Sequence, residues 1–225
     1  MLENQLKKAI NEYNKGLYSE VISTLLLSDY SDEDFIVYYY LGLCYIKIGD
    51  YEGGKESLEH YIELDDNLLR VFQGRMLLAF ASIQLEDYKE AQLHLDKLLD
   101  SGYESAKLYS LLGFIYYKKK MMAKSVKYYR LAISIDPENA NALNSLGYIL
   151  ADYKDDLKEA ETLCRRALSI NVDNPAYLDS LGWVCLKNNK FSASQSFFNR
   201  ALMLSPKNDV ITKHIKELEK VGPKL

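Results

Sequence analysis

Small and apolar residues recur along this chain with the spacing of one helical face. In the stretch LYSLLGFIYY they lie four before, one before, at and three after a glycine, as Tyr109, Leu112, Gly113 and Tyr116. This i, i+3, i+4, i+7 spacing predicts an amphipathic helix. A short polar break follows each such stretch, and a second apolar stripe then begins, as in KNNKFSA followed by Phe198, Ala201 and Leu202. The pattern therefore predicts two helices joined by a short turn.

The same pattern occurs six times. Its small central residue, which we call the anchor, is found at Ala9, Gly42, Ala79, Gly113, Gly147 and Gly182. Successive anchors are 33 to 37 residues apart, a period typical of proteins in which each hairpin packs only on its neighbours. Pro137 and Pro206 follow two of the predicted second helices, where proline prevents further helix. Asn174 and Pro175 are a capping residue and a first-turn proline, so a helix is expected to begin there.

This repeat resembles the tetratricopeptide repeat (TPR), which carries a large residue, leucine, glycine and tyrosine in its first helix and alanine and proline later, on a 34-residue period. The resemblance implies an all-α fold, a right-handed α-solenoid of six helical hairpins plus a C-terminal capping helix, forming a single domain over residues 1–225. We expect the repeats at residues 2–34, 35–68, 72–105, 106–139, 140–174 and 175–208, and the capping helix at 209–221.

Several positions depart from the family pattern. Lys8 replaces the usual leucine in the first repeat, and the third repeat has Arg75 at the large position and Ala79 as anchor. Three additional residues precede the third repeat, and one lies in the ADYKDDLKEA turn of the fifth. We expect these departures to alter local geometry and to leave the fold unchanged.

The anchor glycines are predicted to be packing positions, because a larger side chain would hold two paired helices apart. Neither G-x-x-x-x-G-K-[ST] nor G-x-G-x-x-G occurs, so these glycines do not indicate a phosphate loop. Cys44, Cys164 and Cys185 have no C-x-x-C spacing and are interpreted as packed thiols. The histidines, His60, His94 and His214, lie far apart in sequence with no nucleophile or carboxylate pattern beside them. We therefore predict no catalytic residue, no cofactor and no metal site.

Composition and charge change this picture little. The 225 residues are 48% hydrophobic and carry a formal net charge of −4. That charge is unevenly divided: residues 1–105 hold 9 Lys/Arg and 20 Asp/Glu, and residues 106–225 hold 19 and 12. The N-terminal sequence lacks an apolar signal core, and no segment has the length of a membrane span. We expect a cytoplasmic protein; the alternative is a periplasmic or secreted one whose signal peptide has been removed.

A second stripe of the first helices is the candidate binding surface, since in the TPR family these helices line a concave groove that holds peptides. The residues directly after the anchors become increasingly aromatic along the chain, ending in Tyr148 and Trp183. They either line an open groove or fill space between neighbouring hairpins. The predicted groove consists of Tyr39, Leu43, Met76, Phe80, Phe114, Tyr117, Asn144, Tyr148, Asp179, Trp183 and Lys187.

The predicted function is a non-catalytic protein–protein interaction module or scaffold that binds an extended or helical partner segment in this groove, with the charge gradient setting its orientation. Leu6 and Ile10 stand where the family's carboxylate clamp would fall, so a chaperone C-terminus is not the expected ligand. Two alternatives stay open. The chain could assemble with copies of itself into a scaffold, or bind RNA through the basic run from Lys118 to Arg130. Nucleic acid is the less favoured partner, because the acidic N-terminal half would oppose a continuous polyanion track.

Overall fold

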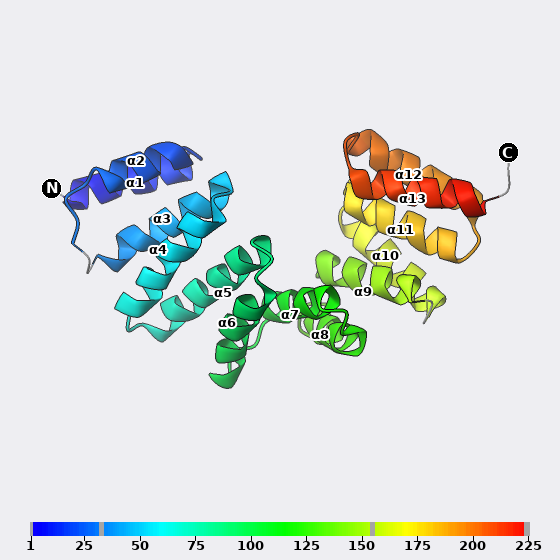
Figure 1. The fold of residues 1–225 in the computed structure, drawn as a ribbon, viewed down its shortest axis with the longest axis horizontal. Coiled ribbons are helices and arrows are strands. Elements are labelled where there is room, and N and C mark those ends of the chain that lie inside the picture. Colours follow the sequence, from blue (N-terminus) through cyan, green and yellow to red (C-terminus); the bar gives the residue numbers. More distant parts are fainter. Residues whose placement is uncertain (1, 32–33, 154–155, 223–225) are drawn as a thin grey trace. The chain divides into compact units, whose positions relative to one another are not determined.

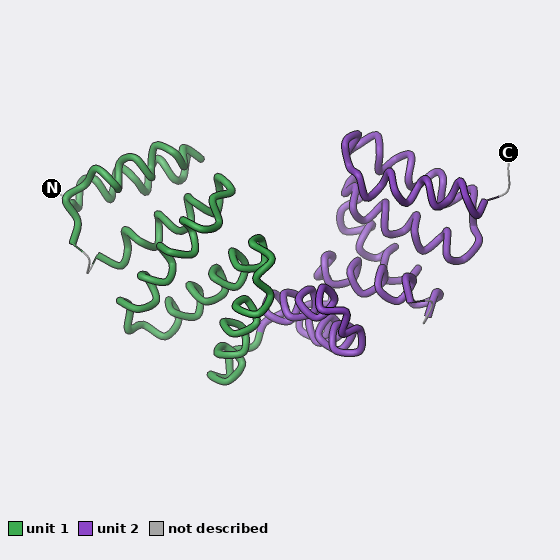
Figure 2. The backbone as a smooth tube through the Cα atoms, in the orientation of Figure 1, with its two compact units in different colours: residues 1–104 green, residues 105–225 purple. Residues whose placement is uncertain are grey.

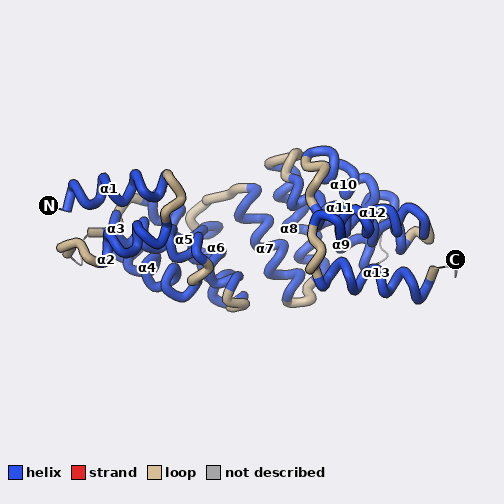
Figure 3. Tube along the Cα trace, turned by 90° about the horizontal axis from the view of Figure 1, so that it is seen from above, coloured by secondary structure: helices blue, strands red, loops and turns tan. Residues whose placement is uncertain are grey.

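The computed structural model describes residues 2–31, 34–153 and 156–222, and these residues form thirteen helices and no strand (Figures 1 and 3). The all-α fold class predicted from the sequence is thereby confirmed. The helices are α1 (Leu2–Asn14), α2 (Tyr18–Leu26), α3 (Phe35–Ile48), α4 (Tyr51–Leu64), α5 (Leu68–Gln84), α6 (Tyr88–Asp100), α7 (Ala106–Lys118), α8 (Met122–Ile135), α9 (Ala140–Asp152), α10 (Leu157–Ile170), α11 (Pro175–Lys187), α12 (Phe191–Leu204) and α13 (Asp209–Val221).

The helices belong to two compact units (Figure 2). Unit 1 covers residues 1–104 and contains the hairpins α1–α2, α3–α4 and α5–α6. Unit 2 covers residues 105–225 and contains the hairpins α7–α8, α9–α10 and α11–α12, followed by α13 packed on α11 and α12. A single solenoid domain over the whole chain stays a prediction, and each unit is described by itself.

The helix boundaries follow the expected repeats closely, with one difference. Helix α5 begins at Leu68, four residues before the expected start of the third repeat. The three additional residues therefore lengthen the first helix, because the Asn67 side chain caps it by accepting a hydrogen bond from the Arg70 backbone N–H. Part of the fifth repeat's turn, residues 154–155, lies outside the described residues, as do residues 32–33 of the first repeat.

At the starts of α4–α7, α9–α11 and α13, the capping side chain accepts a hydrogen bond from a backbone N–H group that the helix leaves unpaired. Asn174 accepts from the N–H groups of Ala176 and Tyr177, and Pro175 occupies the first turn, as the sequence predicts.

Within the hairpins, the residue seven after the anchor adopts a left-handed conformation in every described case. Glycine takes this position in the first two repeats, and Glu86, Lys120 and Asn189 take it at φ 60°, 58° and 57° in three others.

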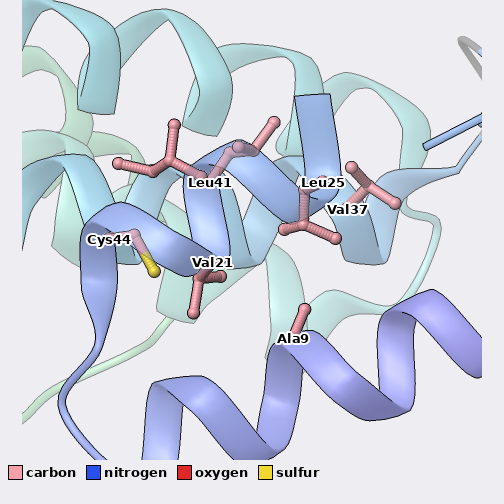
Figure 4. Packing of buried hydrophobic residues seen from close by; sticks show 7 residues of the cluster. Ala9, Val21, Leu25, Val37, Leu41 and Cys44 are labelled. Carbon is pink, nitrogen blue, oxygen red and sulfur yellow. The ribbon is translucent and has the colours of Figure 1, made fainter. Parts of the chain in front are cut away.

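The core of the first hairpins shows how small anchors allow close packing. In Figure 4 the Ala9 methyl group points from α1 toward Val21 and Leu25 of α2. Val37, Leu41 and Cys44 of α3 complete this cluster. Ala9 and Cys44 have no exposed surface, so a larger side chain at either position would need the helices to separate.

The anchor glycines lie where paired helices touch, which confirms their predicted role. A Cβ atom at Gly147 would lie 2.6 Å from Cys164 Sγ and 2.9 Å from the backbone oxygen of Ala160, both on α10. At Gly182 it would lie 2.6 Å from two atoms of the Phe198 ring. Real Cβ atoms do not approach this closely, so only glycine fits at the present helix separation.

Candidate partner-binding site

The eleven predicted groove residues divide between the two units. In unit 1, Tyr39 is half-buried and its hydroxyl accepts a hydrogen bond from Gln73 Nε2 at 2.6 Å. Phe80 contacts Tyr51 edge-on, and Met76 is buried, with 7% of its surface exposed. Leu43 is also half-buried. These four side chains are therefore largely engaged with the surrounding helices.

Five of the other seven predicted residues line a pocket in unit 2, whereas Trp183 and Lys187 do not. It has a volume of about 390 Å³, within the range of ligand-binding pockets. The first helices α7, α9 and α11 form most of its wall, Tyr129 of α8 adds to it, and α13 closes one side. Its lining consists of Phe114, Tyr117, Tyr129, Asn144, Ser145, Tyr148, Ile149, Ala176, Asp179, Ser180, Val210 and His214.

Aromatic rings dominate this pocket. The rings of Tyr117 and Tyr148 meet edge-on at 6.5 Å between centroids, and each phenol affects the pKa of the other. Burial raises the pKa of Tyr148 well above its usual value and raises the pKa of Tyr129 to about 12. Both phenols are therefore neutral at physiological pH. The pocket presents ring faces and uncharged hydroxyl groups to a ligand.

One end of the pocket is closed by a contact between α11 and α13. His214 Nδ1 lies 2.9 Å from both carboxylate oxygens of Asp179. The imidazole also stacks on Trp183 at 4.4 Å between ring centroids. The ammonium group of Lys187 lies over the same Trp183 ring, 4.1 Å from its centre. Asp179 and Trp183 are only 6% and 8% exposed, so they support the wall more than they offer open surface.

Sequence reasoning did not include His214 in the groove. One signal could have found it. His214 lies three residues after Ile211 and four before Leu218, so it falls on the apolar face of the capping helix between two residues that are buried. A polar residue on a buried face requires a partner, and Asp179 is that partner.

The family is decided by the repeat itself. The family model described as tetratricopeptide repeat matches residues 36–68, 106–139 and 176–208. The chain is a TPR protein. These matched ranges agree within one residue with the second, fourth and sixth of the repeats expected from the anchors, and each contains a leucine–glycine pair.

Known relatives cover this TPR protein only in part. It is 38% identical over 93 residues to a TPR repeat-containing protein of Pseudomonas aeruginosa, across 41% of this chain and 16% of that protein. It is 34% identical over 92 residues to the uncharacterized protein ycf37 of Pyropia yezoensis, across 41% of this chain and 48% of that protein. The chain thus matches about a sixth of the first relative and about half of the second.

Solved structures agree on the fold. The Cut9–Hcn1 structure superposes with a TM-score of 0.81 over 95% of this chain and 42% of that one, at 14% identity. PilF of Pseudomonas aeruginosa gives a TM-score of 0.67 at 20% identity, covering 84% of this chain and 85% of that one. YrrB, described as a TPR protein with an unusual peptide-binding site, gives 0.58 at 18% identity, covering 88% and 97%. At these identities the likeness shows the fold alone.

The TPR repeats leave little reactive chemistry at the site. The described residues contain no cluster of three or more His, Cys, Asp or Glu that could hold a metal ion. Burial raises the pKa of Cys44 to about 11 and of Cys164 to about 12, so these thiols are protonated and unreactive at neutral pH. No helix in the described part of the chain combines the length and apolar character needed to span a membrane. TPR proteins are generally non-catalytic and mediate protein–protein contacts.

The basic run of the fourth repeat is engaged with the protein's own groups. Lys124 lies over the Tyr116 ring and Lys127 over the Tyr128 ring, at 5.1 and 5.8 Å from the centroids. Arg130 makes two hydrogen bonds to the Glu159 carboxylate at 2.7 and 2.8 Å. These two rings and three charged groups already have partners within unit 2, which weakens the case for RNA binding through this run; RNA binding stays a less favoured prediction.

Proposed function

We propose that this TPR protein is a non-catalytic binding module, and that unit 2 holds a segment of a partner protein in the aromatic pocket. The pocket itself carries this proposal: about 390 Å³ of space, bordered mainly by first helices and rich in tyrosine. Large aromatic residues are the types that most often dominate the energetics of protein interfaces. A partner side chain that enters the pocket would remove apolar surface from water.

The side chains around the pocket are held in place by their neighbours, so a ligand would bind to a rigid surface. Tyr148 contacts Tyr117, Trp183 and His214, and His214 is in turn held by Asp179. A ring whose neighbours fix its position loses little conformational freedom when a ligand arrives, so more of the contact energy appears as affinity. Phe114 and Tyr148 are also half-buried rather than buried, and so retain surface for a ligand.

The test uses random peptides displayed on phage and selected on the full-length chain. Peptides recovered on the wild-type protein are then measured against Phe114→Ala and Tyr148→Ala by isothermal titration calorimetry. We expect each substitution to weaken binding by about 2 kcal/mol at a central position. Tyr128→Ala is the matched control: this tyrosine stacks on Tyr116 in the same hairpin as Phe114 but does not line the pocket.

Thermal unfolding of the same variants separates binding from packing. Replacing a fully packed phenylalanine with alanine costs about 3 to 5 kcal/mol of stability. Lost affinity with nearly unchanged unfolding supports the groove. If the selected peptides bind the folded Tyr148→Ala variant as tightly as the wild type, the proposed site is wrong.

A further inference from the structure

In unit 2 an aromatic residue directly follows each of the three anchor glycines, and two of these three rings are covered by a cation from their own helix. The Lys118 ammonium group lies over the Phe114 ring at 5.5 Å, and the Lys187 ammonium group lies over the Trp183 ring at 4.1 Å. In both pairs the lysine follows the ring by four residues, which places the two side chains on one helical face. Each ring directly follows an anchor glycine, so these are equivalent positions in the fourth and sixth repeats.

The repeat between them breaks this pattern. Its ring is Tyr148, and the residue four positions later is Asp152. No ammonium or guanidinium group of a described residue lies over the Tyr148 ring. Asp152 is close enough to act electrostatically on the hydroxyl groups of Tyr148 and Tyr117, and it contributes to the raised pKa of both. The middle repeat thus has the ring and lacks the cation, and an anion stands in the cation's place.

We propose that the pocket binds the ammonium group of a partner's lysine side chain, seated against Tyr148 as Lys118 and Lys187 are seated against the neighbouring rings. This inference rests on the proposed function and specifies which side chain of the partner segment enters the pocket. Cations are attracted to the face of a tyrosine ring, and more strongly where the site is partly dehydrated. The methylene stem of lysine would meanwhile cover apolar surface of the pocket wall.

The charges around the pocket support a cationic ligand. Two carboxylate groups lie at the pocket, those of Asp152 and Asp179, together with the ammonium group of Lys118 and the imidazole of His214. Lys118 is already placed against Phe114, and His214 against Asp179. Asp152 and Lys118 each lack a partner charge within ion-pair distance among the described residues, and an arriving ammonium group would supply one to Asp152.

A buried amide provides a further acceptor. Asn144 lines the pocket, and its Oδ1 atom is buried without a hydrogen-bond partner. An unpaired buried acceptor destabilises the folded protein, and rotation of this amide toward a donor in the pocket would relieve that cost. Lysine carries three N–H donors and no acceptor, so it suits this site better than a carboxylate or a neutral apolar side chain.

The probes that test this inference are Nα-acetyl-lysine methylamide and Nα-acetyl-norleucine methylamide. They share an unbranched four-carbon stem, and only the lysine probe carries a terminal ammonium group. Each is titrated into the full-length protein at constant chloride concentration. The readout is the fluorescence of Trp183, the protein's one tryptophan, whose ring lies 6.3 Å from Tyr148. We expect saturable binding of the lysine probe and binding at least about tenfold weaker for the norleucine probe.

The decisive variant is Asp152→Lys, which restores the arrangement of the two neighbouring repeats. A lysine here should occupy the face of Tyr148 from within the chain and weaken the lysine probe at least about tenfold. The variant should stay folded, because a cation in the last turn of α9 suits the helix dipole. Glu219→Lys is the matched control: it makes the same charge change at an exposed position on α13 and should leave probe binding unchanged.

The outcomes separate this inference from the proposed function. Equal binding of the two probes, both lost in Tyr148→Leu, would retain an apolar groove and overturn the lysine assignment. Full binding of the lysine probe to Asp152→Lys would also overturn it. Absence of saturable lysine binding to a wild-type protein that still binds selected peptides through Tyr148 would reject the inference alone. Tighter binding of N-acetyl-arginine methylamide than of the lysine probe would reject lysine as the occupant.

Discussion

Replacing Gly147 with alanine tests the packing of the repeat most directly. An exposed glycine in the interior of a helix is about 1 kcal/mol less favourable than alanine, so helix propensity alone predicts stabilisation. At Gly147 the new methyl group would meet Cys164 Sγ at 2.6 Å and the Ala160 backbone oxygen at 2.9 Å. Overpacking a core by one group typically costs about 1 to 3 kcal/mol, and the backbone contact here cannot be relieved by a side-chain rotation.

We therefore expect Gly147→Ala to destabilise unit 2 by about 1 to 2 kcal/mol after the propensity gain is included. Urea unfolding measures the change, and hydrogen exchange should locate it in α9 and α10. Gly53→Ala is the comparison, since its new methyl group in the first turn of α4 would meet two side chains and no backbone atom: the capping Asp50 carboxylate at 2.9 Å and the Tyr45 ring at 3.2 Å. That variant should lie within about 0.5 kcal/mol of the wild type.

A double-mutant cycle divides the cost between the two contacts. Cys164→Ala removes the sulfur atom and leaves the Ala160 oxygen in place, so Gly147→Ala should be less destabilising in that background by a measurable coupling energy. Stabilisation of Gly147→Ala by about 1 kcal/mol, the value for an exposed glycine, would refute the close helix contact.

Four further outcomes are expected. Burial lowers the pKa of His94 to about 4, whereas a histidine of the unfolded chain has a pKa of about 6.5, so on acidification the unfolded chain binds the proton first. The contribution of His94 to stability is therefore fully present above pH 6.5, and the unfolding free energy should fall by up to about 3 kcal/mol toward pH 4. Urea unfolding should detect this loss in the wild type and not in His94→Leu. Glu86→Gly should raise the unfolding free energy by about 1 kcal/mol by removing left-handed strain, measured against Glu86→Ala. Iodoacetamide at pH 8 should label Cys44 and Cys164 only after urea unfolding, as mass spectrometry would show. Truncation before Asp209 should shift Trp183 emission to the red and reduce hydrogen-exchange protection in α11 and α12, with unit 1 unchanged.

The fold could be predicted from the sequence because its determinants recur. Gly113, Gly147 and Gly182 each mark a place where two helices touch, and a period of about 34 residues repeats that signal along the chain. Propensity and capping agree with it at Asn174 and Pro175. The start of α5 could not be placed, because the repeat period predicts where a helix should begin, whereas the Asn67 side chain decides where it does begin.

The candidate site was predictable only in part. Phe114, Tyr117 and Tyr148, which the helical stripe placed in one groove, line one pocket, since spacing along α7 and α9 fixes which residues share a face. Spacing within one helix carries no information about how deeply a neighbour covers it. The burial of Trp183 could therefore not be predicted, because His214 of α13 covers its ring. The pairing of His214 with Asp179 could not be predicted either, because it joins residues 35 positions apart.

In a repeat protein, the shared positions determine the fold, and a site specific to one protein must use positions that differ between repeats. Gly147 has the same role as Gly113 and Gly182, so replacing it affects stability and indicates nothing about the ligand. Asp152 differs in charge from Lys118 and Lys187 at the equivalent position, while the three rings that precede these residues are retained. A half-buried carboxylate at this position is not required by hairpin packing, because the two neighbouring hairpins fold with lysine there. The exchange of charge at Asp152 is therefore the feature of unit 2 that selects a ligand, and the Asp152→Lys variant should separate binding from folding.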